Sequence, residues 1–109
     1  MDEKPEKAIM KIPNSLKIGG HTYQVILRNR EKEDGNSNLG SCNNHLHKIW
    51  LDTEVSNTLQ EETFLHEIIE ALNYNYQLEM SHQTITILTT IFYQVLKDND
   101  ICFKTDKNI

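Results

Sequence analysis

The sequence predicts an α+β domain in which a small antiparallel sheet, made of two β-hairpins, packs against two helices. Two observations predict the hairpins: the glycine pair Gly19-Gly20 and the asparagine pair Asn43-Asn44 each lie between segments with strand-like patterns. The helices are predicted by the helical spacing of the apolar residues after about residue 58. A chain of 109 residues suffices for one core, so we expect a single domain over residues 1–109.

The first hairpin is predicted over residues 15 to 27. Gly19 and Gly20 supply the positive φ angles that a two-residue hairpin turn requires. A polar, glycine-containing loop is expected from Glu31 to Asn38.

The second hairpin is expected to pair residues 39–42 with residues 45–52. In its later strand, alternation places His45, His47, Ile49 and Leu51 on one face. Ile49 and Leu51 are expected to face the core. We therefore interpret the two histidines as partly buried structural residues rather than as a metal-binding pair.

Two helices follow, the first from about Thr58 to Asn75 and the second from the N-cap Ser81 to near Asp98. In the second helix, one face carries the apolar residues Ile85, Leu88, Ile91, Phe92, Val95 and Leu96. The stripe expected to form core consists of Ile85, Leu88, Phe92 and Val95. Residues 1–10 and 100–109 are polar and are expected to be flexible ends.

Composition excludes several classes of function. The net charge of −5 argues against nucleic-acid binding, which needs clustered basic residues. No apolar run approaches the roughly 20 residues that cross a bilayer, so we expect no membrane association and a cytoplasmic location, in a bacterium or a phage-infected host cell. Cys42 and Cys102 show no metal-knuckle spacing, and Cys42 is expected to pack, with a thiolate ligand as the alternative.

The stretch from Thr63 to Leu72 contains a near match to the HExxH zinc helix, with Glu70 in place of the second histidine. Residues four apart lie one turn apart on the same side of a helix, so His66 and Glu70 can hold one ion. Glu67 lies about 100° further round the helix, where it can accept a proton from metal-bound water. The pattern therefore predicts two metal ligands and a catalytic base.

A catalytic Zn²⁺ needs a third protein ligand and an open position. His82 is the candidate, because it occupies the first turn of the next helix, which antiparallel packing brings beside the first. Glu79, in the bend between the helices, is the alternative third ligand. Tyr93, about 20° from His82 round the second helix, is a candidate proton donor to a developing oxyanion.

From about Leu39 to Asn99 the chain resembles the small phage and mobile-element zincins related to the ImmA/IrrE metallopeptidases. The residues that carry the resemblance are Thr63 to Ala71, similar to the family's "TLLHEIIHA" helix, and Phe92 to Asn99, similar to its "LYQVLKDN" segment. In that family the first helix gives two histidine ligands and the next gives a glutamate near the position of His82. This chain thus departs from the family by an apparent exchange of Glu70 and His82.

The resemblance implies a minimal zincin-like fold and a zinc-dependent metallopeptidase whose substrate is a protein or peptide, such as a repressor or other regulator in a phage or mobile element. Two further hypotheses remain open. The chain could be an inactive zincin scaffold that acts by binding a partner protein, or a structural zinc domain with a fourth protein ligand. The oligomeric state does not follow from the sequence.

Overall fold

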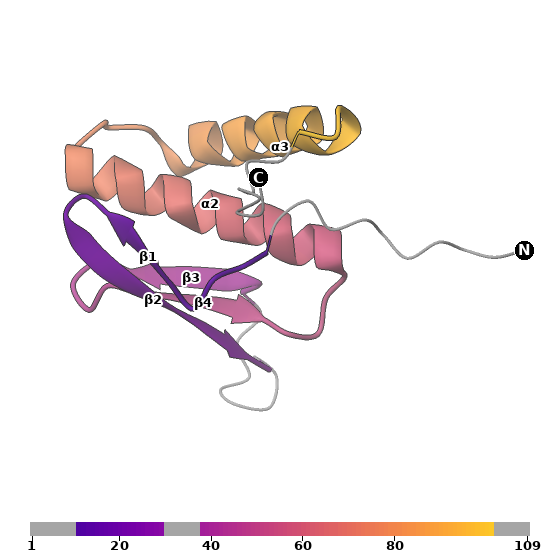
Figure 1. The fold of residues 1–109 in the computed structure, drawn as a ribbon. Helices are drawn as coiled ribbons and strands as arrows, with labels where there is room; N and C mark the ends of the chain where they lie inside the picture. Colours follow the sequence, from indigo (N-terminus) through magenta and orange to yellow (C-terminus); the bar gives the residue numbers. More distant parts are fainter. Residues whose placement is uncertain (1–10, 30–37, 102–109) are drawn as a thin grey trace, which may run out of the picture.

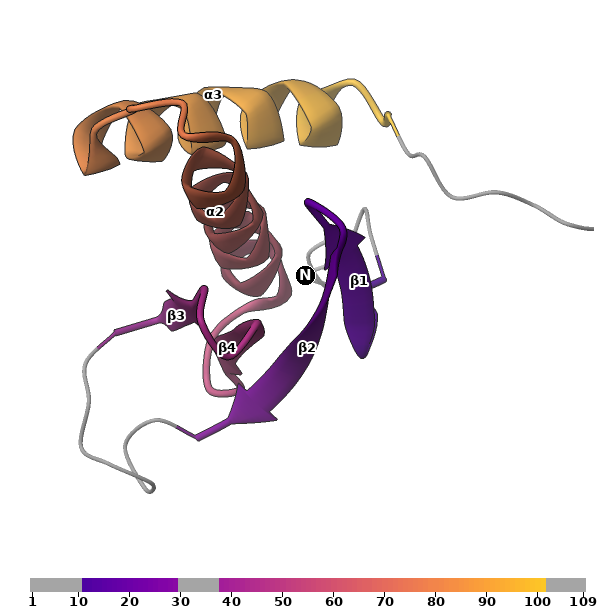
Figure 2. The same cartoon turned by 90° about the vertical axis from the view of Figure 1, so that its left-hand side faces the viewer.

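The computed structural model describes residues 11–29 and 38–101, which form three layers: a sheet, helix α2 and helix α3 (Figures 1 and 2). The elements are β1 (Ser15–Ile18), β2 (His21–Arg28), β3 (Gly40–Asn43), β4 (Lys48–Asp52), α2 (Asn57–Tyr76) and α3 (His82–Asp98). The predicted α+β class is confirmed. The expected flexible ends fall largely outside the described residues, as does most of the expected loop from Glu31 to Asn38. No helix in the described ranges is long and apolar enough to cross a membrane.

The first hairpin has the predicted two-residue turn. Ile18 and His21 are paired residues of β1 and β2, and Gly19 and Gly20 between them have φ angles of 60° and 84°. Both angles lie in the left-handed region that glycine adopts without a steric penalty. The glycine pair therefore fixes the register of the hairpin.

The turn of the second hairpin is longer than predicted. Asn43 pairs with Lys48, so four residues rather than two connect β3 to β4. The Asn43 side chain causes this, because its Oδ1 accepts hydrogen bonds from the backbone N–H groups of His45 and Leu46, both at 2.9 Å. The placement of His45 and His47 in a strand was wrong, since both lie in this turn, and His47 has a φ of 59°.

The sheet is mixed rather than wholly antiparallel. Its strand order is β1-β2-β4-β3, and the two central strands, β2 and β4, run parallel, whereas the outer pairs are antiparallel. The prediction of an antiparallel sheet is therefore wrong at the central pair. Each hairpin is a local structure, but the pairing between the hairpins depends on contacts distant in sequence, which the pattern of one strand does not specify.

One face of the sheet packs against α2. Ile49 and Leu51 are 0% and 1% exposed, which confirms that they face the core, and they contact a cluster that includes Phe64 and Ala71 of α2. Tyr23 of β2 belongs to the same cluster, and its hydroxyl accepts a hydrogen bond from Asn75 Nδ2 at 2.9 Å. The sheet and α2 thus share one core.

Helix α3 packs on the side of α2 that faces away from the sheet (Figure 2). Its buried residues are Ile85, Thr89, Tyr93 and Leu96. The predicted core stripe is therefore buried only at Ile85. The prediction is wrong for Leu88, Phe92 and Val95, which are 38% to 49% exposed, and Ile91 on the same face is 55% exposed. The apolar side chains of α3 cover one half of its circumference, but the buried residues lie at the border of that half, so the apolar periodicity alone does not identify the buried face.

Gly40 allows β3 to lie close to α2. A Cβ atom on Gly40 would lie 2.6 Å from Thr63 Cγ2 and 3.0 Å from the Trp50 carbonyl oxygen. We expect Gly40→Ala to lower the free energy of unfolding by about 1–3 kcal/mol, because the backbone oxygen cannot move away cheaply. Urea denaturation measures this, with Ser41→Ala in the same strand as the control. An unchanged midpoint for Gly40→Ala would contradict the close packing.

Candidate metal centre

Helix α2 brings His66 and Glu70 into contact. Their spacing of four residues places them on adjacent turns of one face, and His66 Nε2 lies 3.1 Å from Glu70 Oε2. The side chains are 17% and 27% exposed, so both groups lie at the edge of the helix packing rather than in the core.

His82 reaches the same carboxylate from the next helix. Its Nδ1 lies 2.9 Å from Glu70 Oε2, and its ring centroid is 5.0 Å from that of His66. Ser81 begins α3 as predicted, with its side chain accepting a hydrogen bond from the N–H of Thr84. His82 is therefore held in the first turn of α3, although 76% of its side chain is exposed.

The Asn73 side chain fixes the bend that carries the chain from α2 to His82. Its Oδ1 accepts a hydrogen bond from the N–H of Met80 at 3.0 Å, and its Nδ2 donates one to the Met80 carbonyl at 3.1 Å. Gln77 ends α2 in the left-handed conformation, with a φ of 51°. These local interactions determine where α3 begins, and thus where His82 lies.

The three donor groups suit a single small cation. One ligand atom from each of His66, Glu70 and His82 lies within 4.8 Å of the other two. In a tetrahedral zinc site with bonds of about 2.0–2.1 Å, ligand atoms are roughly 3.3–3.5 Å apart. Two of the separations here are 3.1 and 2.9 Å, so small side-chain shifts would open the group around an ion. Glu79, the alternative third ligand, is exposed and lies outside this group.

Glu67 is a buried carboxyl group beside these donors. It is 7% exposed, and burial raises its pKa to about 7, with a further contribution from the charge of Glu70. A Cβ on Gly40 would lie 3.4 Å from Glu67 Oε2, so β3 covers this side of the carboxyl group. Glu67 is thus a proton acceptor whose pKa is close to neutral pH.

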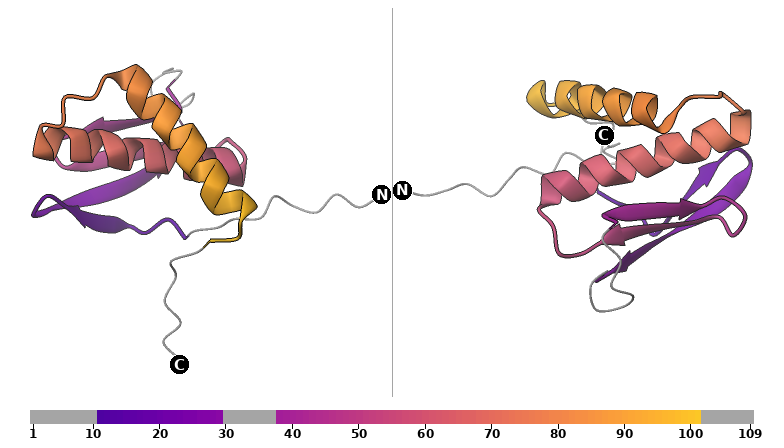
Figure 3. Two further views of the ribbon diagram at one scale, coloured as in Figure 1. Left: turned by 90° about the horizontal axis from the view of Figure 1, so that it is seen from above. Right: turned by 180° about the vertical axis from the view of Figure 1, so that it is seen from behind.

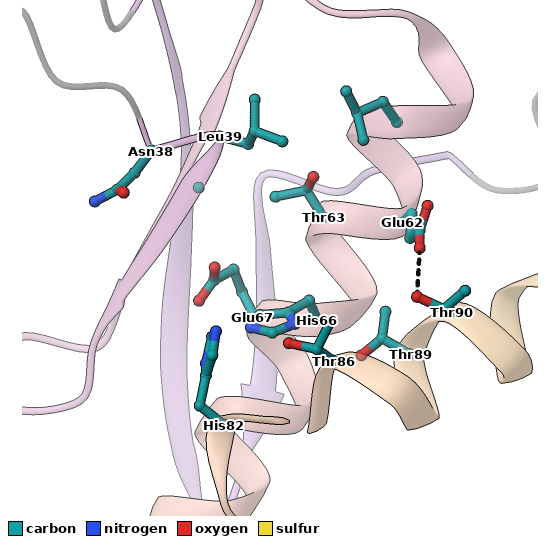
Figure 4. A pocket seen from close by; sticks show the side chains of 12 residues that line it. Asn38, Leu39, Glu62, Thr63, His66, Glu67, His82, Thr86, Thr89 and Thr90 are labelled. Carbon is teal, nitrogen blue, oxygen red and sulfur yellow. Dashed lines mark hydrogen bonds between the residues drawn. The ribbon is translucent and has the colours of Figure 1, made fainter. Parts of the chain in front are cut away.

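A pocket of about 440 Å³ opens at this group (Figure 4). Figure 4 shows the Glu67 carboxylate and the imidazole rings of His66 and His82 gathered at one end of the pocket. Asn38, Leu39 and Gly40 line it from the side of β3, and residues of α2 and α3 line the rest. Glu70 is not among the lining residues, so it is His66, His82 and Glu67 that face a space that a ligand can enter.

Sequence reasoning missed the threonines of this pocket, which are Thr63 on α2 and Thr86, Thr89 and Thr90 on α3. Thr89 is 2% exposed, and its Oγ1 has no hydrogen-bond partner within the described part of the chain. The three α3 threonines follow His82 at helical intervals of four, seven and eight residues, so they share its side of the helix. That spacing is the signal that could have identified them.

Of the two other candidates that the sequence offered for the site, Cys42 lies near the three-donor group without belonging to it, and Tyr93 has a different hydrogen-bond partner. Burial, with the nearby charges of Glu67 and Glu70, raises the pKa of the Cys42 thiol to about 12, so the thiol is protonated at neutral pH. Tyr93 is buried between the helices and donates a hydrogen bond to Glu61 Oε1 at 2.7 Å. Its hydroxyl group therefore does not point into the pocket.

His45 and His47 lie in the turn after β3, apart from the donor group. The His45 ring contacts Tyr74 edge-on, and the His47 ring stacks on that of His21 at a centroid distance of 4.3 Å. The prediction that both are partly buried is confirmed for His47, which is half-buried, and is wrong for His45, which is exposed.

Comparisons with protein-family models, with curated proteins and with solved structures find no match to this chain. The family resemblance of the two helices therefore stays a prediction, and the site is interpreted from its own geometry.

The metal-free protein should lose stability as Glu67 ionises. Its pKa of about 7 in the folded state lies above the usual 4.5, so the folded state binds the proton more tightly. The resulting stabilisation is complete below pH 4.5 and is lost as the pH rises to about 7, a change of about 3 kcal/mol at 1.36 kcal/mol per pKa unit. Glu67→Gln should remove this dependence.

Urea denaturation in the presence of a chelator, across this pH range, measures the difference between wild type and Glu67→Gln. Glu54→Gln is the matched control, because Glu54 is exposed. A difference in unfolding free energy that stays constant with pH would show that Glu67 is not held in a desolvated position.

Proposed function

We propose that this chain is a zinc-dependent peptidase, in which His66, Glu70 and His82 hold Zn²⁺ and Glu67 is the general base. The observation that carries the proposal is the convergence of the three donor atoms within 4.8 Å, beside a buried carboxyl group and at the end of a pocket. Two imidazoles and one carboxylate are a ligand set of catalytic zinc sites, which keep a fourth position open.

The roles of the residues follow from their positions. Bound Zn²⁺ in such a site acts as a Lewis acid toward a carbonyl group and lowers the pKa of water to about 7. The Glu67 carboxylate accepts a proton from the water that attacks the peptide carbonyl, and returns it to the amine that leaves. The raised pKa of Glu67 in the metal-free protein, about 7, reflects the burial of its carboxyl group beside the three donors.

The pocket supports a peptide as the substrate. It is open along β3, α2 and α3, and its lining combines apolar groups such as Leu39 and Leu59 with threonine hydroxyls. A mixed lining of this kind fits a chain that carries both side chains and amide groups.

Metal content tests the ligand set. Protein purified from zinc-supplemented medium should contain one zinc ion per chain. Inductively coupled plasma mass spectrometry measures this metal content. His66→Ala, Glu70→Ala and His82→Ala should each weaken zinc binding by at least about 100-fold, since each removes a direct ligand. Glu79→Ala is the matched control and should bind as wild type does.

Two outcomes would contradict this ligand set. Zinc that survives His82→Ala but not Glu79→Ala would make Glu79 the third ligand. Metal-free wild-type protein, obtained after gentle purification, would rule out the catalytic zinc site altogether.

Glu67→Gln separates an enzyme from a binding protein. The substitution keeps the size of the side chain and should leave zinc bound, while hydrolysis of a peptide library should fall about 10²–10⁴-fold through loss of the general base. Mass spectrometry of the cleaved peptides measures the rate, with Glu54→Gln as the control. Wild-type protein that holds stoichiometric zinc but cleaves no peptide would favour the alternative, a zincin-like scaffold that binds a partner protein.

A further inference from the structure

The outer face of α3 is a continuous apolar surface. Its exposed large side chains are Ile87, Leu88, Ile91, Phe92 and Val95, each between 38% and 55% exposed. Successive residues are 100° apart round a helix, so these five side chains cover about 140° of the circumference. We call this set the α3 outer face.

Charge is absent along the same length of helix. From Gln83 to Leu96 the sequence contains no acidic or basic residue, and the charged residues of α3 lie at its last turn. The exposed side of a surface helix ordinarily carries charged and polar groups. A face without them is typical of a helix that another apolar surface covers.

Among residues 11–29 and 38–101, nothing covers this face of α3. Helix α3 is the outermost layer, with α2 between it and the sheet (Figures 2 and 3). A hollow of about 260 Å³ on this side is lined by apolar residues alone: Ile69 of α2 with Leu88, Ile91, Phe92 and Val95. A protruding side chain from a partner could occupy this hollow.

A second copy of this chain fits the face. Leu88, Ile91 and Val95 have the alternating spacing of three and four residues that forms the seam between two packed helices. Because the face is uncharged, two copies related by a two-fold axis bring no like charges together. An antiparallel arrangement would also place the positive end of each helix dipole beside the negative end of the other.

The available area is sufficient for a weak dimer. Five half-exposed apolar side chains offer roughly 400–500 Å² per copy, and with the residues at their margins the total for two copies is about 1,000 Å². This value lies at the lower limit for a specific interface, so we expect dissociation in the micromolar range. We propose that two copies of the chain associate through their α3 outer faces to form a symmetric dimer.

Such a dimer would leave the pocket accessible. Thr86, Thr89 and Thr90 line the pocket from another side of α3, away from the outer face. The inference is therefore independent of the proposed peptidase activity, and a failure of either proposal leaves the other standing.

Sedimentation equilibrium of the full chain, from about 1 to 200 µM, tests the proposal. The mass should rise with concentration from 12.7 kDa toward twice that value. Ile91→Lys should remain a monomer at every concentration, because it places a charge at the centre of the face. Ile91 is 55% exposed in the single chain, so the variant should still fold, as circular dichroism will show.

Gln83→Lys is the matched control. It adds the same charge to an exposed position of α3 outside the outer face, and should dimerise as wild type does. An Ile91→Lys variant that dimerises normally would overturn the assignment of the interface. Wild-type protein that stays monomeric up to about 200 µM would overturn the dimer itself and indicate that a different molecule covers the face.

Discussion

Helix α2 is packed on two sides, and the arrangement of the molecule depends on this constraint. Phe64 and Ala71 face the core shared with the sheet, whereas Leu65 contacts the buried residues of α3. Only a narrow strip of α2 between the two neighbours remains for polar side chains near the core. His66 and Glu70 occupy that strip, where His66 lines the pocket and Glu70 Oε2 lies 3.1 Å from His66 Nε2.

The same packing raises the free energy of the ionised form of Glu67. It is buried against β3, and the neighbouring Glu70 adds a second negative charge, so ionising it in the metal-free protein is unfavourable. A bound divalent cation would offset both effects, because it attracts the two carboxylates that otherwise repel each other. The proposed metal centre would therefore account for a buried carboxyl group beside a second carboxylate and two imidazoles.

The sequence predicted those parts of the fold that local interactions determine. The Gly19-Gly20 turn and the Ser81 cap each follow from the conformation or hydrogen bonding of one or two residues. The contact of His66 with Glu70 follows from helix geometry in the same way. The parallel pairing of β2 with β4 could not be predicted, since it joins segments over twenty residues apart whose side chains would suit either direction. The position of His82 beside Glu70 depends on the hydrogen bonds between Asn73 and Met80. No motif in the sequence predicts these hydrogen bonds.

The orientation of α3 links the candidate metal centre to the exposed apolar face. Burying the α3 outer face, which is centred on Leu88, Ile91 and Val95, would require α3 to turn by roughly 100° about its axis. That rotation would carry His82 away from Glu70 and break the hydrogen bond between Tyr93 and Glu61. The described residues of a single chain therefore cannot both complete the three-donor group and cover the most apolar surface. A second molecule on the outer face would meet both requirements, because it would cover the apolar stripe while His82 stays beside Glu70.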